Sequence, residues 1–304
     1  MPRTVKLTRY DGNPILRPIP EHTFEAQNVS NAAAIVHDGR VHLLYRSEGF
    51  ENRWPNTKTW PKTYLGLATS RDGLHIDERL DRPVIGPEPA GEYGCWGIQD
   101  PRLVKIGDTF YATTAGVSPW GDRVILYTSK DLRSWEKRAL IKPEHEMRTA
   151  GMFPEKFGDD YCFLLRPDPN MWIGYTPDFV HWRGYKLMFE VKRGSWYGRK
   201  LGLGAPPIRQ DDAWLLFWHG KADTQDGTYS LGVMWLDLED PGRIIRVQEE
   251  PILRAELEWE RVGYYPNVAY TCGAVQLGDQ YLVYYGAADR VLAVAKVPVA
   301  DCRL

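Results

Sequence analysis

The chain has 304 residues, with 38 lysines and arginines against 40 aspartates and glutamates. This balance leaves no excess of basic residues of the kind that marks nucleic-acid-binding proteins, and we expect no nucleic-acid partner. No run approaches the roughly 18 apolar residues of a membrane span, and residues 1–6 contain no apolar signal-peptide core. The composition therefore predicts a globular protein of the cytoplasm without a membrane partner.

The aromatic content is high, at 12 tryptophans and 17 tyrosines, and is accompanied by 28 glycines and 22 prolines. This combination is typical of β-strands joined by tight turns, with most rings in the core and some able to stack on sugars. The four cysteines are far apart and lack the C-x-x-C spacing or paired histidines of a zinc site. We expect neither a disulfide framework nor a bound metal, so chelators should have no effect.

In chain order, five apolar segments each break at an acidic or glycine-containing turn and resume as a second apolar run. Runs of this kind on either side of a short turn predict β-hairpins. The turns are Asp38-Gly39, Gly107-Asp108, Gly158-Asp159-Asp160, Asp211-Asp212 and Gly278-Asp279. A further short strand follows each hairpin, and these strands begin near Gly66, Ile125, Ile173, Leu231 and Leu292.

The hairpin turns recur about every 50–70 residues, which is the spacing of propeller blades. Each of the five units supplies three or four antiparallel strands. The sequence therefore predicts an all-β fold, a single five-bladed β-propeller over residues 1–304 with the active site in its central channel. A β-sandwich is the structural alternative, but its strands would not repeat this regularly.

In a propeller the innermost strand of each blade begins beside the central channel, so residues at these strand starts converge whatever their separation in the sequence. The predicted walls of the site are residues 28–31, 99–102, 149–153, 202–207 and 265–267. Asp100 is the most informative of them, because it stands beside a proline and Arg102 at the start of an apolar strand. Taken by itself, an aspartate before a proline is also a common turn residue.

The ordered motifs of nearly the whole chain resemble glycoside hydrolase family 130, the inverting β-mannoside phosphorylases and their few hydrolase relatives. Each motif is weak alone, whereas the ordered set is specific. The motifs are Asn13–Leu16, Asn28–Asn31, Leu44–Arg46, Asp100–Arg102, Phe153–Lys156, Lys200–Ile208, Trp218–Gly220, Gly263–Val268 and Tyr284–Asp289.

The resemblance implies that inorganic phosphate attacks the anomeric carbon of a β-mannosyl unit and releases α-mannose 1-phosphate with inversion. Asp100 matches the family's general acid, whose proton is thought to reach the glycosidic oxygen through a mannose hydroxyl. No second carboxylate is needed to activate water, because phosphate is already a good nucleophile. The substrates would be a β-mannosyl oligosaccharide and phosphate, and no cofactor is implied.

The resemblance also implies binding residues, since a phosphate dianion needs cationic groups to hold it. The residues that would bind phosphate are Arg123, Arg148, Arg166, Lys200 and His219. The residues that would bind the sugar are Asn31, Arg46, Arg102, Asn267 and Asp289. Simpler interpretations exist for some of them: Arg148 as a surface charge, His219 as a core histidine and Asp289 as a turn cap. Residues 204–207 are expected to allow close backbone approach.

Two positions depart from the family pattern. Gln99 stands where an acidic residue is frequent, and residues 146–149 replace an Asn-Lys-Asp-like cluster, which weakens one expected phosphate contact. The acceptor sugar and its linkage therefore stay open, since they also depend on the loops around residues 53–63 and Trp172. A homo-oligomer is compatible with the sequence.

Two other functions stay open. A glycoside hydrolase on the same propeller would need a further carboxylate as a base, and the available ones are Glu48, Glu155, Glu258 and Glu260. A non-catalytic sugar-binding propeller would have no use for a site that holds a dianion. The retained cationic residues therefore favour the phosphorylase.

Overall fold

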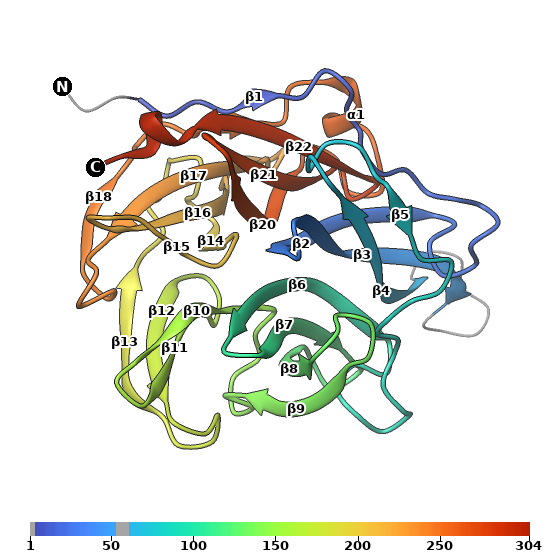
Figure 1. Ribbon diagram of the computed structural model, residues 1–304, viewed down its shortest axis with the longest axis horizontal. Helices are drawn as coiled ribbons and strands as arrows, with labels where there is room; N and C mark the ends of the chain where they lie inside the picture. Colours follow the sequence, from blue (N-terminus) through green and yellow to red (C-terminus); the bar gives the residue numbers. More distant parts are fainter. Residues whose placement is uncertain (1–3, 53–60) are drawn as a thin grey trace.

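The structure is a computed structural model that describes residues 4–52 and 61–304. Nearly all of its regular structure is β, as the sequence predicts. The helices of the described ranges are α1 (Glu258–Arg261) and the 3-10 helix η1 (Val299–Cys302). Neither comes near the length and apolarity that crossing a membrane requires. The strands form consecutive antiparallel groups placed round a common centre (Figure 1).

Five such groups follow one another along the chain. The first contains β2 (Asn28–His37), β3 (Arg40–Asn52), β4 (Pro61–Ser70) and β5 (Glu78–Arg79). The second contains β6 (Gly97–Ile106), β7 (Thr109–Val117), β8 (Arg123–Ser129) and β9 (Glu136–Ile141). The third contains β10 (Thr149–Phe157), β11 (Asp160–Arg166), β12 (Met171–Thr176) and β13 (Arg183–Phe189).

The fourth group contains β14 (Lys200–Leu203), β15 (Ile208–Arg209), β16 (Trp214–Lys221), β17 (Tyr229–Leu236), β18 (Ile244–Val247) and β19 (Leu253–Arg254). The fifth contains β20 (Ala269–Leu277), β21 (Gln280–Ala287), β22 (Val291–Pro298) and, from the other end of the chain, β1 (Thr8–Arg9). Because Thr8 pairs with Lys296, both ends of the chain belong to one group. A parallel pair, Thr63 with Gly97, joins the first two groups.

The turn residues explain the five hairpins, all of which the structure confirms. Gly39, Gly107, Gly158 and Gly278 have φ between 61° and 70° in the turns of the first, second, third and fifth hairpins. This left-handed conformation costs glycine least, because it has no Cβ. The predicted third strands are also present, as β4, β8, β12, β17 and β22.

Separate hydrophobic clusters lie between neighbouring groups. Alternate side chains of a strand point to opposite faces, so each middle strand packs against two neighbours. In β3, for example, Leu43 and Tyr45 pack with the fifth group, whereas Leu44 packs with the second. The second and third, third and fourth, and fourth and fifth groups share clusters in the same way. The groups therefore form a ring with a core at each junction, whereas a sandwich has one core between two sheets.

The first strand of each group lies nearest the centre of the ring (Figure 1). β2 contacts β6 and β20, β6 contacts β10, and β10 contacts β14. The pairing register shifts at Ser30/Ala33 in β2, Gln99/Arg102 in β6 and Thr271/Gly273 in β20. Such bulges re-aim side chains and are frequent beside active sites. The strand starts therefore meet at the centre, as the sequence predicts.

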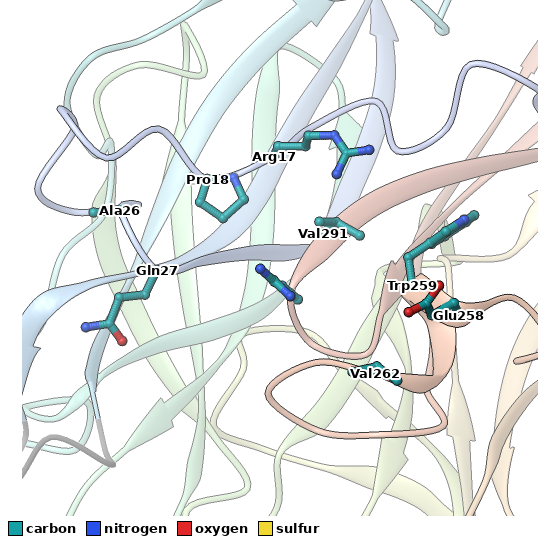
Figure 2. A pocket seen from close by; sticks show the side chains of 9 residues that line it. Arg17, Pro18, Ala26, Gln27, Glu258, Trp259, Val262 and Val291 are labelled. Carbon is teal, nitrogen blue, oxygen red and sulfur yellow. The ribbon is translucent and has the colours of Figure 1, made fainter.

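A cavity of about 500 Å³ lies beside this ring, between α1 and the segment that leads into β2 (Figure 2). α1 itself is short, and an ion pair links it to the N-terminal segment. Glu260 accepts a hydrogen bond from Arg9 Nε at 2.7 Å and also bonds the backbone N–H groups of Glu256 and Leu257.

Candidate active site

Asp100 lies near the start of β6, at the bulge, and only 6% of it is exposed. Its φ of 50° and the φ of 45° at Asn31 place both residues in the left-handed region. Non-glycine residues rarely adopt this conformation, so the surrounding strands must hold it. As a result, the Asn31 amide donates to Asp100 Oδ1 at 2.8 Å across the centre of the ring. The side-chain oxygen of Asn31, Oδ1, is buried and has no partner in residues 4–52 and 61–304.

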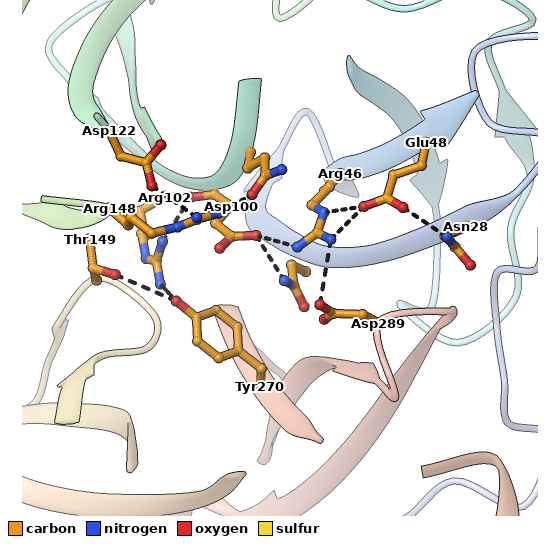
Figure 3. A network of polar contacts seen from close by, with 12 residues as sticks. Asn28, Arg46, Glu48, Asp100, Arg102, Asp122, Arg148, Thr149, Tyr270 and Asp289 are labelled. Atoms are coloured by element: carbon orange, nitrogen blue, oxygen red, sulfur yellow. Dashed lines mark hydrogen bonds and ion pairs between the residues drawn. The ribbon is translucent and has the colours of Figure 1, made fainter. Parts of the chain in front are cut away.

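Arg46 on β3 connects three carboxylates (Figure 3). It forms ion pairs with Glu48 at 2.5 Å, Asp100 at 3.4 Å and Asp289 at 3.5 Å. Burial alone would lower the pKa of the Arg46 guanidinium, but Asp289, Glu48 and Asp100 raise it well above its usual value. Arg46 is therefore a permanent cation between the first, second and fifth groups.

The two aspartates beside Arg46 are shifted in opposite directions. Burial raises the pKa of Asp289, and the nearby charges of Asp100 and Glu48 add to this rise. Burial also acts to raise the pKa of Asp100, but Arg46, Arg102, Arg148 and the Asn31 amide outweigh it and lower that pKa. Without ligands, Asp100 is thus held as a carboxylate, whereas Asp289 is the more easily protonated of the two.

Arg102 lies one position beyond Pro101 in β6 and is buried. Its guanidinium donates to the carbonyl oxygens of Asp100 at 2.7 Å, Gly204 at 3.1 Å and Leu203 at 3.3 Å, and to the Tyr270 hydroxyl at 3.1 Å. These partners belong to the second, fourth and fifth groups. The arrangement suits a residue that holds the strand starts together more than one that contacts sugar directly. Gly204 allows the backbone to approach β16 this closely, since a Cβ there would lie 2.6 Å from the Phe217 carbonyl oxygen.

The two departures from the family pattern meet in the structure. Arg148 donates one hydrogen bond to the side-chain oxygen of Gln99 and forms an ion pair with Asp122 at 2.9 Å (Figure 3). Gln99 therefore offers a neutral oxygen to a guanidinium one residue from Asp100. Arg148 is not an isolated surface charge, because this pairing holds it beside the centre of the ring.

Three of the predicted phosphate ligands lie together on the third and fourth groups. Arg166 ends β11, Lys200 begins β14, and His219 lies opposite Gly202 in β16. A Cβ on Gly202 would lie 3.0 Å from Arg166 Cδ and 3.1 Å from His219 Nε2, so the glycine leaves room for both side chains. Asp168 pairs with Arg166 at 3.0 Å and with Lys200 at 3.8 Å.

The charges of this cluster differ from the simplest expectation. Burial lowers the pKa of Lys200 to about 8, and the neighbouring cation Arg166 contributes to the decrease. Burial likewise lowers the pKa of His219 well below its usual value, with Arg102 and Arg166 acting in the same direction. The sequence suggested His219 as one of the cations that hold phosphate. In the structure it is a neutral imidazole at pH 7, because protonating the ring would place a further positive charge in a buried site beside guanidinium groups.

Buried polar atoms without partners gather in this cluster. Within the described ranges, neither ring nitrogen of His219 forms a hydrogen bond of normal geometry, although the Thr271 backbone lies close enough to act on the ring. Arg166 Nε has no partner in the same ranges. Buried polar groups are nearly always hydrogen-bonded in proteins, so each exception calls for an explanation. The oxygens of a bound ligand could accept hydrogen bonds from Arg166 Nε–H and from the N–H of the neutral His219 ring.

Two predicted residues lie apart from these contacts. The Arg123 guanidinium donates to the carbonyl oxygens of Pro143 and Asp122 and lies 4.8 Å from the centre of the Tyr93 ring. Asn267 precedes β20, and its carbonyl oxygen accepts from the Tyr229 N–H at 3.0 Å. In the described part of the chain, neither side chain bonds another predicted site residue. Of the predicted acceptor loops, residues 53–60 lie outside the described residues, and Trp172 lies in β12 stacked on Tyr185.

Several residues of the site were missed by the sequence analysis. Tyr270 accepts a hydrogen bond from Arg102 and lies against His219, with ring centroids 3.9 Å apart and the rings tilted by 34°. Lys221, opposite Lys200, donates to the Tyr265 hydroxyl at 2.7 Å. Asp122 was overlooked beside Arg123. Lys221 directly follows the Trp-His-Gly motif, so its place at the end of the same strand could have been predicted from the sequence. No sequence signal pointed to Tyr270 or Asp122.

Glu48 is a further case, since the sequence offered it only as a hydrolase base. It is 2% exposed and binds the Asn28 amide at 2.7 Å as well as Arg46. Glu48→Ala would leave the buried Arg46 without its shortest ion pair. Because Asp100 and Asp289 still pair with Arg46, its charge stays compensated, and we expect a loss of about 1–3 kcal/mol in the free energy of unfolding, measured by urea denaturation. Glu155→Ala is the matched control, because Glu155 pairs with Arg209 in an exposed ion pair worth about 0–1 kcal/mol. Equal losses in both variants would contradict this role for Glu48.

Known proteins match almost the whole chain. The family model described as β-1,4-mannooligosaccharide phosphorylase matches residues 7–302. The chain is 38% identical to the 1,2-β-oligomannan phosphorylase of Thermoanaerobacter sp. (strain X514), over 98% of this chain and 99% of that one. It is 39% identical to a β-1,2-mannobiose phosphorylase of the same organism, over 96% and 97% of the two chains.

The fold is similar as well. The structure of β-1,2-mannobiose phosphorylase from Listeria innocua, in complex with β-1,2-mannobiose, matches with a TM-score of 0.86 and 26% sequence identity. The match covers 97% of this chain and 98% of that one. With the family model and both Thermoanaerobacter relatives matching nearly end to end, the chain belongs to glycoside hydrolase family 130.

Proposed function

We propose that this protein cleaves β-mannosides by phosphorolysis, with inversion, to give α-mannose 1-phosphate and a shortened acceptor sugar. The family assignment and the phosphorylase relatives support this function. Both Thermoanaerobacter relatives are named for β-1,2-linked substrates, and we propose the β-1,2 linkage for this protein too. Phosphate is a substrate in this reaction, and no cofactor is required.

One observation carries the proposal: partnerless buried polar atoms lie among cations close to a buried aspartate. Arg166 Nε and both nitrogens of His219 are the partnerless atoms, and Lys200 lies in the same cluster. The Nε–H of Arg166 and the single N–H of the neutral His219 ring are donors that suit a phosphate, which presents several oxygens at once. We propose Arg166, Lys200 and His219 as phosphate ligands, with Arg148 between them and Asp100. Arg123 stays a prediction with less support, because its guanidinium is bound to backbone carbonyls.

The sugar site is proposed on the opposite side of Asp100. Asn31 Oδ1 is a buried acceptor without a partner, and Arg46 and Asp289 offer a donor and an acceptor beside it. Asn267 completes the predicted set. For Arg102 we propose a positioning role, because its donors are used by backbone oxygens and Tyr270.

A hydrolase is the second candidate, and the positions of the four carboxylates weigh against it. Glu48 is bound by Arg46, Glu260 by Arg9, and Glu155 by Arg209. Glu258 lines the separate cavity beside α1. None of these four lies in the cluster of cations. Asp168 does, but its two oxygens pair with Arg166 and Lys200, which leaves it poorly placed to accept a proton from water.

The finer structural and cellular predictions are proposals too. The ring of five strand groups supports a single five-bladed β-propeller with its site at the centre. The cysteines at positions 95, 162, 272 and 302 are all unpaired, which suits a reducing compartment such as the cytoplasm.

Cleavage of a β-mannoside should depend on phosphate and give an α-configured product, because a single displacement inverts the anomeric carbon once. Proton NMR of the first product formed from β-1,2-mannobiose tests both points. Phosphate-free buffer is the control, and EDTA should not change the rate. Free mannose released equally fast without phosphate would establish the hydrolase instead.

A further inference from the structure

The cavity beside α1 has the size and lining of a ligand site. Its volume of about 500 Å³ lies within the range of small-molecule sites. Arg17 and Gln27 line one side, Glu258 and Trp259 of α1 line the opposite side, and Val291 lies between them (Figure 2). The cavity therefore combines an indole ring with donors and acceptors that face a common space.

The polar side chains of this cavity are not used by the fold. Across residues 4–52 and 61–304, the side chains of Arg17, Gln27, Glu258 and Arg290 form no hydrogen bond or ion pair. Arg9 differs from them, because it also reaches α1 but forms ion pairs with both Glu260 and Glu256. Four polar groups around one cavity thus keep their full bonding capacity for a ligand.

The chemistry of the lining favours a neutral sugar. Trp259 stacks on Tyr285 of the core with ring centroids 6.3 Å apart, so its indole is held in one orientation. An oriented aromatic ring can cover the apolar face of a sugar, while guanidinium, amide and carboxylate groups bind hydroxyls. An anionic ligand would meet the two arginines but also the unpaired carboxylate of Glu258, which would repel it.

The cavity shares backbone with the candidate active site. Gln27 directly precedes Asn28, which binds Glu48, and Arg290 directly follows Asp289. The Val29 N–H donates to the Arg290 carbonyl at 3.1 Å, which ties the two strand ends together. Since consecutive Cα atoms are only about 3.8 Å apart, the cavity begins within one residue of the cluster around Arg46.

We propose that this cavity is a second saccharide site, which holds further mannosyl units of a long β-mannoside whose terminal unit lies at Asp100. The inference rests on the proposed function, because it takes the substrate class from it. The proposed site predicts that short and long substrates bind differently. A disaccharide fills the site at Asp100 alone, whereas a longer chain also gains the contacts with Arg17, Arg290 and Trp259.

The test compares β-1,2-mannobiose with a β-1,2-linked mannohexaose in the variant Arg17→Ala/Arg290→Ala. Both arginines are exposed and unpartnered, so their removal should not disturb the core. We expect the KM for the hexasaccharide to rise about tenfold, the loss of two charge-assisted contacts, with the KM for mannobiose unchanged. Arg82→Ala, which removes an exposed arginine elsewhere, is the matched control.

Calorimetry in phosphate-free buffer adds a measurement that does not depend on turnover, with the hexasaccharide binding the double variant about tenfold more weakly than the unaltered protein. Equal KM values for the hexasaccharide in both proteins would overturn the inference, as would an equal loss for both substrates. A change in molar mass by light scattering in the double variant would assign the cavity to an interface between copies. If mannobiose itself is not cleaved, the proposed function fails instead.

Discussion

Asp100→Asn is expected to lower kcat by about 10²- to 10⁴-fold, the usual cost of losing a general acid. The fold should survive, because asparagine has nearly the same shape and Asp100 is held by a single amide and one long ion pair. Steady-state phosphorolysis of β-1,2-mannobiose measures the rate, and thermal unfolding checks the fold. A variant with a near-normal rate on a substrate with a poor leaving group would contradict the role.

The pKa directions make this prediction sharper. A general acid must carry a proton, yet Arg46, Arg102 and Arg148 lower the pKa of Asp100 in the ligand-free protein. A phosphate dianion bound near Arg148 would offset these positive charges and raise that pKa again. Phosphate would then be both the nucleophile and the partner that lets Asp100 hold its proton. We therefore expect the kcat, which reports the enzyme with phosphate bound, to fall at a higher pH than the kcat/KM for phosphate, which reports the enzyme without it.

Asp289→Asn is the matched control. The pKa of Asp289 is already raised, and the residue lies 3.5 Å from the same arginine as Asp100. If Asp289 only binds sugar, its variant should increase KM more than it lowers kcat. A loss of kcat in Asp289→Asn together with a mild effect of Asp100→Asn would exchange the two roles.

Lys200→Ala is expected to raise the KM for phosphate by about 10- to 100-fold, as charge-assisted hydrogen bonds are the stronger kind. The KM for the sugar should change much less, because Lys200 lies with Arg166 and Asp168 rather than with Arg46. Initial rates at varied phosphate and saturating mannobiose measure the effect. His219→Ala should act in the same direction through a neutral hydrogen bond. Lost sugar affinity with normal phosphate saturation would refute the assignment.

The charge of Lys200 also predicts a pH dependence. Burial and Arg166 lower its pKa to about 8, so the ammonium loses its proton as the pH rises through that value. The affinity for phosphate, measured by calorimetry in the absence of sugar so that the protonation of Asp100 for catalysis does not contribute, should therefore fall as the pH rises above 8, by up to about tenfold per pH unit. Lys200→Arg should move the fall to higher pH, since a guanidinium stays protonated. An unchanged profile in Lys200→Arg would assign the pH limit to another group.

The sequence alone determined the strands and the turns, and it predicted that Asp100 lies at the start of a central strand. These features depend on local chemistry: alternating apolar runs make strands, and glycine takes the left-handed turn positions at residues 39, 107, 158 and 278. The repeat of the hairpins then predicted that strand starts would converge. Asn31, Arg46, Asp100 and Asp289 do meet there, although up to 258 residues separate them in the chain.

Tertiary structure decided which side chains pair and which are charged. Arg148 reaches Gln99 and Asp122 only because the segments that lead into β8 and β10 lie beside the start of β6, and Arg102 is used by backbone oxygens that no motif reveals. His219 is neutral and Lys200 has a lowered pKa because burial disfavours a charge, and burial is a property of the assembled ring. Local patterns carry information about strands and turns, whereas the pairing and protonation of site residues depend on neighbours that only folding brings together.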